Sequence, residues 1–369
     1  MGGTSELQKL RNYMKLKKLS TRLLDNKSAF LVTHEANLYY LTGFPNSEGT
    51  LFITREKSYL LVDFRYGEAV KKSVTNCDVV VYERYYTTLG ELVKKHGITE
   101  IFIESAYTTV RNYSLYKEKF GELKCRITAN DTLDKLISNL RIVKSSDEAA
   151  KIQKAQDITE EAYLELLNMV KPGVSEKELA LELEFLMRKK GAEGVSFDLI
   201  TITGKKTSMP HGVPGDETVK NGDFVTFDIG AVFEGYHSDM TRTIAVGKVS
   251  ERQREIYDIV RKAQLCGLSK VRSGVKASEV DKAARDVIEN SGFGEFYKHS
   301  TGHGVGLDIH ELPFVSSRCE TFLSPGMVIT VEPGIYLPDE FGVRIEDMVL
   351  VTKDGFKNFA SLPKDLIIV

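Results

Sequence analysis

The feature that most constrains this chain is a pair of similar segments, Val225–Val246 and Ile329–Val351. Each has two β-rich runs joined by a polar turn, a pattern that predicts a β-hairpin. Each run contains or adjoins one carboxylate, at Asp228, Asp239, Glu332 and Glu346. Antiparallel pairing brings residues side by side on one face, and a carboxylate buried without a partner is costly. The two segments therefore predict a buried site that needs positive charge, which a pair of divalent cations supplies.

A histidine-rich segment lies between the two predicted hairpins. It is His299-Ser-Thr-Gly-His303-Gly-Val-Gly-Leu-Asp-Ile-His310-Glu311, and it holds three of the 7 histidines of the chain. Imidazole is the commonest metal ligand and a proton carrier near neutral pH, and the glycines let the backbone approach another group closely. A glycine-rich loop with incidental histidines is the alternative. The nearby carboxylates favour His303 as a metal ligand.

A further histidine, His211, lies in Ser208–Gly215 between prolines and glycines. This setting suits a side chain that faces a cleft. On this pattern alone, an ordinary loop histidine is nearly as good an interpretation.

Composition excludes several classes of protein. The 369 residues carry a net charge of -2, so bulk electrostatics gives no reason to expect nucleic-acid or membrane-surface binding. We find no apolar run of about 20 residues and no apolar signal core at the N-terminus. The 4 cysteines are scattered without a CxxC motif, as expected for reduced thiols. We therefore expect a soluble cytoplasmic protein that binds neither nucleic acid nor membrane.

The chain divides into two predicted domains, 1–142 and 143–369. In the first, an amphipathic helix over 6–24 precedes β-rich runs mixed with helical patterns, which predicts an α/β domain with a layered sheet. The runs are Ser28–Thr33, Thr50–Thr54, Ser58–Val62, Asp78–Tyr82 and Glu100–Ile103. The intervening helical patterns lie around Arg65–Ser73 and Thr88–His96.

The second predicted domain repeats one order of elements. A capping box at Ser145–Glu148 starts a helix through Met169, and another at Ser175–Glu178 starts a helix that Gly191 ends. A third helix is predicted from Gln253 to about Val271, and Ser278–Asp281 opens a fourth. The order helix-helix-hairpin therefore occurs twice, which indicates a weak internal repeat. A pseudo-twofold α+β fold would bring the four carboxylates to its centre.

These residues indicate metal-assisted hydrolysis. Four carboxylates and one imidazole form a hard, oxygen-rich site that favours Mn²⁺, Co²⁺ or Fe²⁺ over structural zinc. Two such ions activate a shared water as hydroxide and polarise a carbonyl. His211 and His310 are placed to stabilise the oxyanion, and Arg344, on the same strand face as Glu346, to orient that ligand.

Other catalytic classes find little support. Gly302-His-Gly-Val-Gly306 lacks the spacing and the strand-to-helix setting of a dinucleotide-binding loop. Neither G-x-S-x-G nor H-E-x-x-H occurs in the sequence, so a serine hydrolase and the usual zinc protease are not supported.

The second domain resembles the pita-bread metallopeptidases, specifically the Xaa-Pro branch that contains aminopeptidase P and prolidase. The segment His299–Glu311 matches that branch's signature, and four shorter motifs match in order. These are Phe227-Asp-Ile-Gly, His237-Ser-Asp239, Val331-Glu-Pro-Gly and Val343-Arg-Ile-Glu346. Residues 1–140 resemble the creatinase-type N-terminal domain, through Asn37-Leu-Tyr-Tyr-Leu-Thr-Gly-Phe and Val62-Asp-Phe-Arg-Tyr66. This implies a creatinase-like, RNase H-like mixed sheet followed by a pita-bread catalytic domain.

The resemblance also implies roles for individual residues. Asp228 and Asp239 would bind one metal ion, and Asp239 and Glu346 would bridge to a second ion held by His303 and Glu332. Mn²⁺ is favoured for both ions, with Co²⁺, Fe²⁺ or Zn²⁺ as alternatives. Glu332 would also shuttle the proton. The groups expected around the scissile bond and the proline of the substrate are His211, His299 and His310, with Arg344 and Tyr336 in support.

The expected reaction is hydrolysis of the peptide bond before proline, with proline-containing peptides as substrates and a homodimer as the assembly. All five ligand positions match, whereas creatinase lacks the metal centre, so a metal-free C–N hydrolase is not favoured. The alternative is a non-catalytic peptide- or protein-binding member of the fold, although such members usually lose metal ligands. The shared motifs do not separate prolidase from aminopeptidase P.

Overall fold

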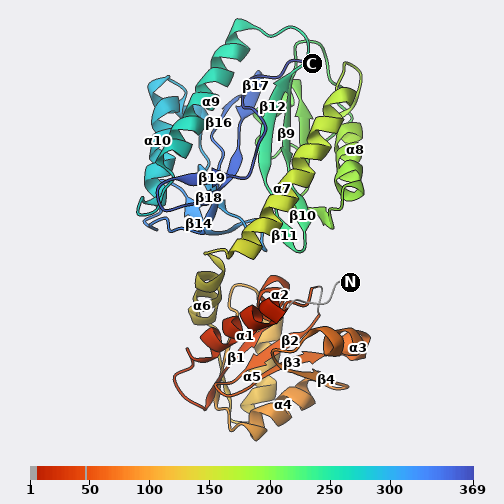
Figure 1. Cartoon of the computed structure of the whole chain (residues 1–369), viewed down its shortest axis with the longest axis vertical. Coiled ribbons are helices and arrows are strands. Elements are labelled where there is room, and N and C mark those ends of the chain that lie inside the picture. The colour runs from red at the N-terminus through yellow and green to blue at the C-terminus, as the bar shows by residue number, and fades with distance from the viewer. Residues whose placement is uncertain (1–5, 46–47) are drawn as a thin grey trace. The chain divides into compact units, whose positions relative to one another are not determined.

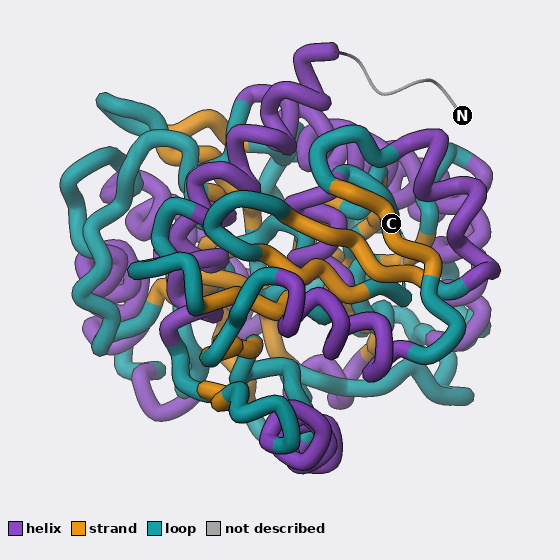
Figure 2. The backbone as a smooth tube through the Cα atoms, turned by 90° about the horizontal axis from the view of Figure 1, so that it is seen from below, coloured by secondary structure: helices purple, strands orange, loops and turns teal. Residues whose placement is uncertain are grey.

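The structure is a computed structural model that describes residues 6–45 and 48–369. The chain divides into two compact units, Met1–Arg141 and Ile142–Val369 (Figure 1). Helices, strands and loops are mixed throughout the backbone, as the tube in Figure 2 shows.

The first unit is built on a mixed six-stranded sheet with the order β4-β3-β2-β1-β5-β6. Strand β2 runs antiparallel to both β1 and β3, and the other pairs are parallel. All five predicted strands are confirmed, and β6 is additional. The strands are β1 (Ser28–Val32), β2 (Thr50–Ile53), β3 (Ser58–Val62), β4 (Asp78–Val81), β5 (Glu100–Ile103) and β6 (Arg126–Thr128).

Helices pack around this sheet. They are α1 (Glu6–Ser20), α2 (Glu35–Thr42), α3 (Phe64–Ser73), α4 (Tyr85–Lys95), α5 (Val110–Gly121) and α6 (Thr132–Arg141). Strand β1 is buried along its whole length, as a strand covered on both faces must be. Helix α1 ends at Ser20, earlier than the predicted residue 24, and Leu24 is 91% exposed.

The second unit contains two helix pairs with strands between them (Figure 1). The helices are α7 (Ser146–Leu166), α8 (Glu176–Lys189), α9 (Glu251–Lys270) and α10 (Ala277–Asn290), with short 3₁₀ turns η1 (Leu167–Met169), η2 (Gly204–Ser208) and η3 (Gly294–Phe296). Both predicted capping boxes are present, at Ser145 with Glu148 and at Ser175 with Glu178. The start of α10 differs from the prediction, because Lys276 is its N-cap and Ser278 lies within the first turn.

The strands of the second unit follow the predicted repeat. After α7 and α8 come β7 (Gly194–Val195), β8 (Ile200–Thr203), β9 (Phe224–Ile229), β10 (Ala231–Phe233), β11 (Tyr236–His237) and β12 (Met240–Ala245). After α9 and α10 come β13 (Gly302–Gly304), β14 (Glu311–Val315), β15 (Val328–Val331), β16 (Gly334–Leu337), β17 (Phe341–Arg344), β18 (Asp347–Val351) and β19 (Phe356–Asn358). The order helix-helix-hairpin is therefore confirmed in both halves.

Each predicted hairpin is broken once in both of its strands. In the first, β9 pairs with β12 and β10 with β11; in the second, β15 pairs with β18 and β16 with β17. The turn at Glu234 and Gly235 has positive φ at both residues, as the tight return requires. The carboxylates lie at or beside these breaks, where the backbone leaves the regular ladder.

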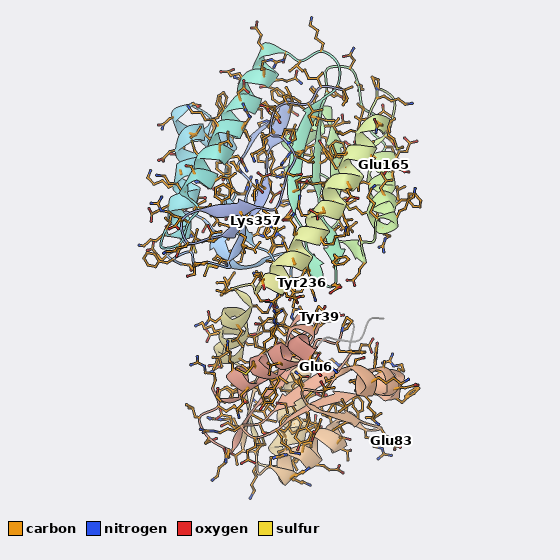
Figure 3. All side chains as sticks on the ribbon, viewed as in Figure 1. Glu6, Tyr39, Glu83, Glu165, Tyr236 and Lys357 are labelled. Atoms are coloured by element: carbon orange, nitrogen blue, oxygen red, sulfur yellow. The ribbon has the colours of Figure 1, made fainter. Side chains whose placement is uncertain are left out.

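Two apolar layers support the strands from opposite helix pairs. Residues of α7 and α8 pack with β9, β10 and β12, where the rings of Tyr163 and Phe227 are 5.5 Å apart. Residues of α9 and α10 pack with β15 to β18. Tyr236 on β11, labelled in Figure 3, donates its hydroxyl to Glu148 Oε1 at 2.8 Å and so joins the start of α7 to the first hairpin. The breaks in the hairpins therefore lie within a well-packed frame.

Candidate metal centre

The first hairpin brings Asp228 and Asp239 to the same end of a strand pair. Asp228 is in β9 and lies opposite Thr241 in the antiparallel register, while Asp239 directly precedes β12. A Cβ atom on Gly230 would lie 2.0 Å from the carbonyl oxygen of Ser238, so only glycine permits this close approach of the two breaks.

The second hairpin places Glu332 and Glu346 in the same way. Glu332 directly follows β15 and Glu346 directly precedes β18, next to the paired residues Val331 and Asp347. The backbone N–H of Glu346 donates to the carbonyl of Thr241 at 3.1 Å, which joins the second hairpin to the first. The predicted meeting of the two hairpins is therefore visible in a direct contact.

His303 enters the centre from β13, between two glycines. A Cβ atom on Gly302 would lie 2.1 Å from the carbonyl oxygen of Thr330, and one on Gly304 would lie 2.3 Å from that of Leu312. The neighbouring strands thus press against the backbone on both sides of His303. Because glycine is required there, the sequence G-H-G fixes the depth of this imidazole.

Three of the expected ligands form one buried group. Ligand atoms of Asp239, His303 and Glu346 all lie within 4.8 Å of one another. Glu332 adjoins this group, since its Oε1 atom is 3.5 Å from His303 Nε2, the same distance that separates His303 Nε2 from Asp239 Oδ2. One imidazole among acidic oxygens is a donor set that suits hard divalent cations.

The fifth expected ligand, Asp228, lies beside the group, and only one of its two carboxylate oxygens has a hydrogen-bond partner among the described residues. Its Oδ2 atom accepts a hydrogen bond from Arg344 Nη2 at 2.6 Å. Its Oδ1 atom is buried and has no hydrogen-bond partner in the described part of the chain. Because buried polar atoms are rarely left unpaired, this oxygen fits a ligand to a cation. The residues present therefore fit a divalent metal centre.

Arg344 has a different partner from the one we expected. We predicted that it would orient Glu346, but it bonds to Asp228, and its Nε donates to Thr241 Oγ1 at 3.1 Å. Glu346 instead accepts a hydrogen bond from Thr241 Oγ1 at 2.7 Å. The reason is that Arg344 ends β17, whereas Glu346 lies beyond the break that precedes β18.

Burial and mutual repulsion dominate the electrostatics of the group. Burial raises the pKa of Asp239 well above its usual value, and the charges of Asp228 and Glu332 raise it further. Burial also raises the pKa of Glu346 well above its usual value, with Asp239 as the next cause. The pKa of Glu332 is raised to about 7, again mainly by burial. Acidic groups crowded in this way favour a bound cation.

The imidazole of His303 is held neutral. Burial, followed by the neighbouring His310, lowers its pKa to about 4. A neutral imidazole is the form that binds a metal ion. The rings of His303 and His310 meet edge to face with centroids 4.3 Å apart, and His310 is exposed.

The two remaining predicted histidines lie near this centre. His299 Nε2 is 3.0 Å from the hydroxyl of Tyr336, which accepts a hydrogen bond from Arg344 Nη1 at the same distance. Burial lowers the pKa of His299 to about 4, with Arg344 as the next cause. The exposed His211 is close enough to lower the pKa of both His299 and His310, although burial is the larger cause for each.

Two threonines contact the ligands and were not predicted. Thr241 bonds to Glu346 and Arg344, and Thr330 Oγ1 lies 3.3 Å from Glu332 Oε1 and accepts the backbone N–H of His303 at 3.1 Å. Each threonine is two residues from a ligand in sequence, as in Asp239-Met-Thr241 and Thr330-Val-Glu332. The period of two along a strand was the signal that could have identified them.

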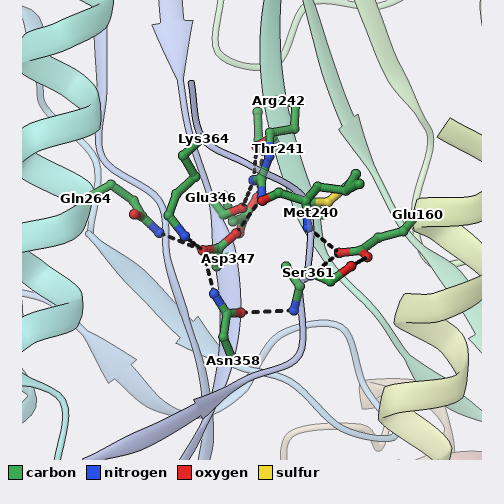
Figure 4. A network of polar contacts seen from close by, with 12 residues as sticks. Glu160, Met240, Thr241, Arg242, Gln264, Glu346, Asp347, Asn358, Ser361 and Lys364 are labelled. Atoms are coloured by element: carbon green, nitrogen blue, oxygen red, sulfur yellow. Dashed lines mark hydrogen bonds and ion pairs between the residues drawn. The ribbon is translucent and has the colours of Figure 1, made fainter. Parts of the chain in front are cut away.

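A second buried network lies directly behind Glu346 (Figure 4). Arg242 Nη1 donates to the carbonyl oxygen of Glu346 at 2.6 Å, and Asp347 holds the same guanidinium. The backbone of Glu346 is thus fixed from one side while its carboxylate faces the ligand group. Taken together, the fold and the site define a metal-binding protein.

The comparisons with known proteins agree with this class. Residues 150–353 match Metallopeptidase family M24, and residues 7–143 match the Creatinase/Prolidase N-terminal domain. The chain belongs to the M24 metallopeptidase family, with a creatinase-type N-terminal domain before a pita-bread catalytic domain. The predicted fold is therefore confirmed.

Relatives match over nearly the whole chain. A Xaa-Pro dipeptidase of Pyrococcus horikoshii is 39% identical over 358 residues, which are 96% of this chain and 98% of the relative. The structure of a Xaa-Pro dipeptidase from Bacillus anthracis aligns with a TM-score of 0.92 and 38% identity, covering 97% of this chain and all of that one. An X-Pro aminopeptidase structure from Thermotoga maritima aligns with a TM-score of 0.87 and 34% identity, covering 95% and 99%. Among the described residues, no helix has the length and apolar character to span a membrane.

Proposed function

We propose that this metallopeptidase hydrolyses the peptide bond between an N-terminal residue and proline. The observation that carries the proposal is the buried group of Asp239, His303 and Glu346 with Glu332 beside it. The substrate class follows from relatives named as Xaa-Pro dipeptidases and Xaa-Pro aminopeptidases, which match nearly the whole chain.

Two divalent ions are the proposed cofactors, with Mn²⁺ favoured and Co²⁺, Fe²⁺ or Zn²⁺ as alternatives. When bound, such ions supply an activated water and polarise the scissile carbonyl. Asp228 and Asp239 would hold one ion, and Asp239 and Glu346 would bridge to the second, held also by His303 and Glu332. The buried Oδ1 of Asp228, which has no hydrogen-bond partner among the residues that the structure describes, and the crowding of the other carboxylates support this set.

Glu332 is the proposed proton shuttle. Its side chain is 18% exposed, so it is more accessible to solvent than the side chains of Asp239 and His303. In the proposed reaction its carboxylate accepts a proton from the attacking water and delivers a proton to the leaving proline nitrogen. The water oxygen bonds to the carbonyl carbon, and the C–N bond to proline then breaks as its nitrogen takes up the proton.

The histidines around the group have proposed substrate roles. His310 and His211 would donate hydrogen bonds to the developing oxyanion, and His299 would contact the substrate near the proline. Arg344 would hold Asp228 in place, and its bond to Tyr336 would fix the hydroxyl that meets His299. Burial lowers the pKa of His299 and of His310, which favours neutral imidazoles that donate a hydrogen bond without adding positive charge beside the ligands.

The decisive experiment is a paired assay with Ala-Pro and Ala-Pro-Ala on Mn²⁺-loaded protein. Cleavage of the dipeptide alone assigns a prolidase, and efficient cleavage of the tripeptide assigns an aminopeptidase P. Activity should disappear on chelation and return with Mn²⁺. Hydrolysis that is indifferent to chelation contradicts the proposed chemistry. Failure to cleave either peptide with any divalent metal favours a non-catalytic peptide-binding protein.

We further propose two domains, 1–142 and 143–369, and a cytoplasmic homodimer. Support for the domains comes from the two compact units and the separate family matches. The dimer is proposed from the resemblance to the Xaa-Pro peptidases, in which the N-terminal domain helps to close the active site of the partner. Sedimentation equilibrium of the purified protein tests it, and a monomer at working enzyme concentration would exclude it.

A further inference from the structure

Glu176, the first residue of α8, has a carboxylate that the metal centre does not explain. The side chain is 1% exposed. Its Oε1 atom accepts the backbone N–H of Thr203 at 2.8 Å, and its Oε2 atom accepts the backbone N–H of Gly215 at 2.8 Å and Lys206 Nζ at 2.7 Å. These three donors satisfy both oxygens of a buried carboxylate, as buried polar atoms require.

The two backbone donors are the two ends of one loop. Residues 204–214 leave β8 at Thr203 and return to Gly215, so a single side chain holds both ends of the loop together. Backbone bonds reinforce the return, since Glu176 N–H donates to the carbonyl of Glu217 at 3.0 Å. Lys206, within the loop, is bonded to both Glu176 and Glu217. Burial alone would lower the pKa of Lys206, but these two bonds raise it, so the ammonium remains charged.

The middle of this loop reaches the metal centre. Thr207 Oγ1 accepts the backbone N–H of Gly342 in β17 at 2.9 Å. The carbonyl oxygen of Pro210 lies 3.4 Å from Arg344 Nη1, and Arg344 is bonded to Asp228. His211 follows Pro210 directly and is exposed. The loop therefore places the exposed His211 directly beside a residue that contacts Arg344, while the ends of the loop are fixed at a helix that contributes no expected ligand.

We propose that Glu176 is a positioning residue that sets the place of His211 by clamping both ends of the loop 204–214. The proposal rests on the proposed function, in which His211 contacts the substrate. Physically, one acceptor group with two oxygens meets three donors, an arrangement that no uncharged side chain of this size reproduces. A glutamine amide would present its own N–H groups to at least one of these donors, which opens the clamp.

The test compares Glu176→Gln with Glu178→Gln, a matched control in the same helical turn. Glu178 is exposed and accepts bonds from Ser175 at the start of α8, and among the described residues no hydrogen bond joins its side chain to the loop 204–214. For E176Q we expect hydrogen exchange in 204–214 to rise about tenfold or more, with Mn²⁺ affinity within about twofold of the parent. For E178Q we expect neither change. Unchanged exchange in E176Q would overturn the clamp.

A double-mutant cycle with His211→Ala separates positioning from general destabilisation. We expect E176Q alone to lower kcat/KM for the Xaa-Pro substrate by about tenfold or more. The change should appear in the same kinetic parameter, kcat or KM, that H211A changes. In the H211A background the same change should cost less than about twofold, because the residue it positions is already gone. Equal losses in both backgrounds would overturn the positioning role.

Lys206→Met provides a second variant if E176Q fails to fold. This variant keeps the Glu176 carboxylate and its bonds to the backbone of Thr203 and Gly215, but removes the ammonium. We therefore expect a smaller loss than in E176Q, in the kinetic parameter that H211A changes. A loss in the other parameter would argue against the clamp. The exchange measurement needs no substrate. Inactive parent protein with faster loop exchange in E176Q would therefore refute the proposed function while leaving the clamp intact.

Discussion

Arg242 Nη2 lies 2.8 Å from Asp347 Oδ1, and neither side chain is more than 2% exposed (Figure 4). Lys364 bonds to the other oxygen of Asp347, and Gln264 and Asn358 complete its partners. Because Arg242 also holds the carbonyl of Glu346, this ion pair links the stability of β12 and β18 to the position of a proposed metal ligand. Its loss should therefore affect both folding and metal binding.

The first prediction concerns Asp347→Asn. Burial alone would raise the pKa of Asp347, but Arg242 and Lys364 outweigh it and lower the pKa. The stabilisation that the ionised Asp347 contributes is then fully present above the pKa of the unfolded state, about 4. It is lost as the pH falls through the lower pKa of the folded state. We expect D347N to lower the free energy of unfolding at neutral pH by about 3–5 kcal/mol, because it leaves the buried guanidinium of Arg242 without its carboxylate.

Urea denaturation at neutral pH and at about pH 3 checks this, because the difference in the free energy of unfolding between the parent and D347N should be smaller in acid. Asp365→Asn is the control. Asp365 pairs with Arg261 at the surface, where its side chain is 75% exposed. That change should cost less than about 1 kcal/mol. Similar losses of unfolding free energy in D347N and D365N would contradict the argument that burial makes the Asp347 ion pair important for stability.

A second prediction concerns proton competition at the metal centre. The pKa values of Asp239 and Glu346 are raised, and that of Glu332 is raised to about 7, so the metal-free site holds protons near neutral pH. A metal ion binds the deprotonated forms and must displace these protons. We expect Mn²⁺ affinity to fall as the pH is lowered from about 8 to about 6. Calorimetry in buffers of different ionisation enthalpy should show proton release, and binding without release would contradict the raised values.

Gly302→Ala tests the close packing around His303. The added Cβ atom would lie 2.1 Å from the carbonyl oxygen of Thr330, so β13 must move away from β15. We expect a loss of about 1–3 kcal/mol in stability and weaker Mn²⁺ binding, because His303 moves with its strand. Gly355→Ala is the matched control, since nothing lies within 4 Å of the added atom. Thermal unfolding and Mn²⁺ titration of both variants test this prediction. Equal stability and equal Mn²⁺ affinity in G302A and G355A would contradict the steric argument.

Arg344→Lys tests the fork that joins Asp228 to Tyr336. The guanidinium donates to Asp228, Thr241 and Tyr336 in one plane, which a single ammonium cannot reproduce. We expect kcat/KM for a Xaa-Pro peptide to fall by about tenfold or more, although the positive charge is kept. Arg252→Lys, at an exposed pair with Glu255, should leave kcat/KM unchanged. Parent-like activity of R344K would show that charge alone suffices.

Local patterns in the sequence were enough to predict most elements of the fold. The capping boxes at Ser145 and Ser175 start helices because the bonds involved span only three residues. The start of α10 was misplaced at Ser278, because Lys276 is the N-cap without a side-chain cap: its backbone N–H donates to Glu279 Oε1, and its carbonyl oxygen accepts the backbone N–H of Glu279. Backbone caps leave little trace in residue type. The β-rich runs, the turn at Glu234 and the position of each carboxylate within them were likewise local features.

By itself, then, the sequence determined the elements, the two hairpins, the repeated order and the residue types of the candidate centre. The tertiary structure decided the partners. Arg344 meets Asp228 across 116 positions of the chain, and Glu176 bonds to Thr203, 27 residues away, where the loop leaves β8. Such pairs depend on where separately formed hairpins and helices pack. Short-range sterics and hydrogen bonds are encoded by neighbouring residues, whereas these contacts exist only once the hydrophobic layers have brought the elements together.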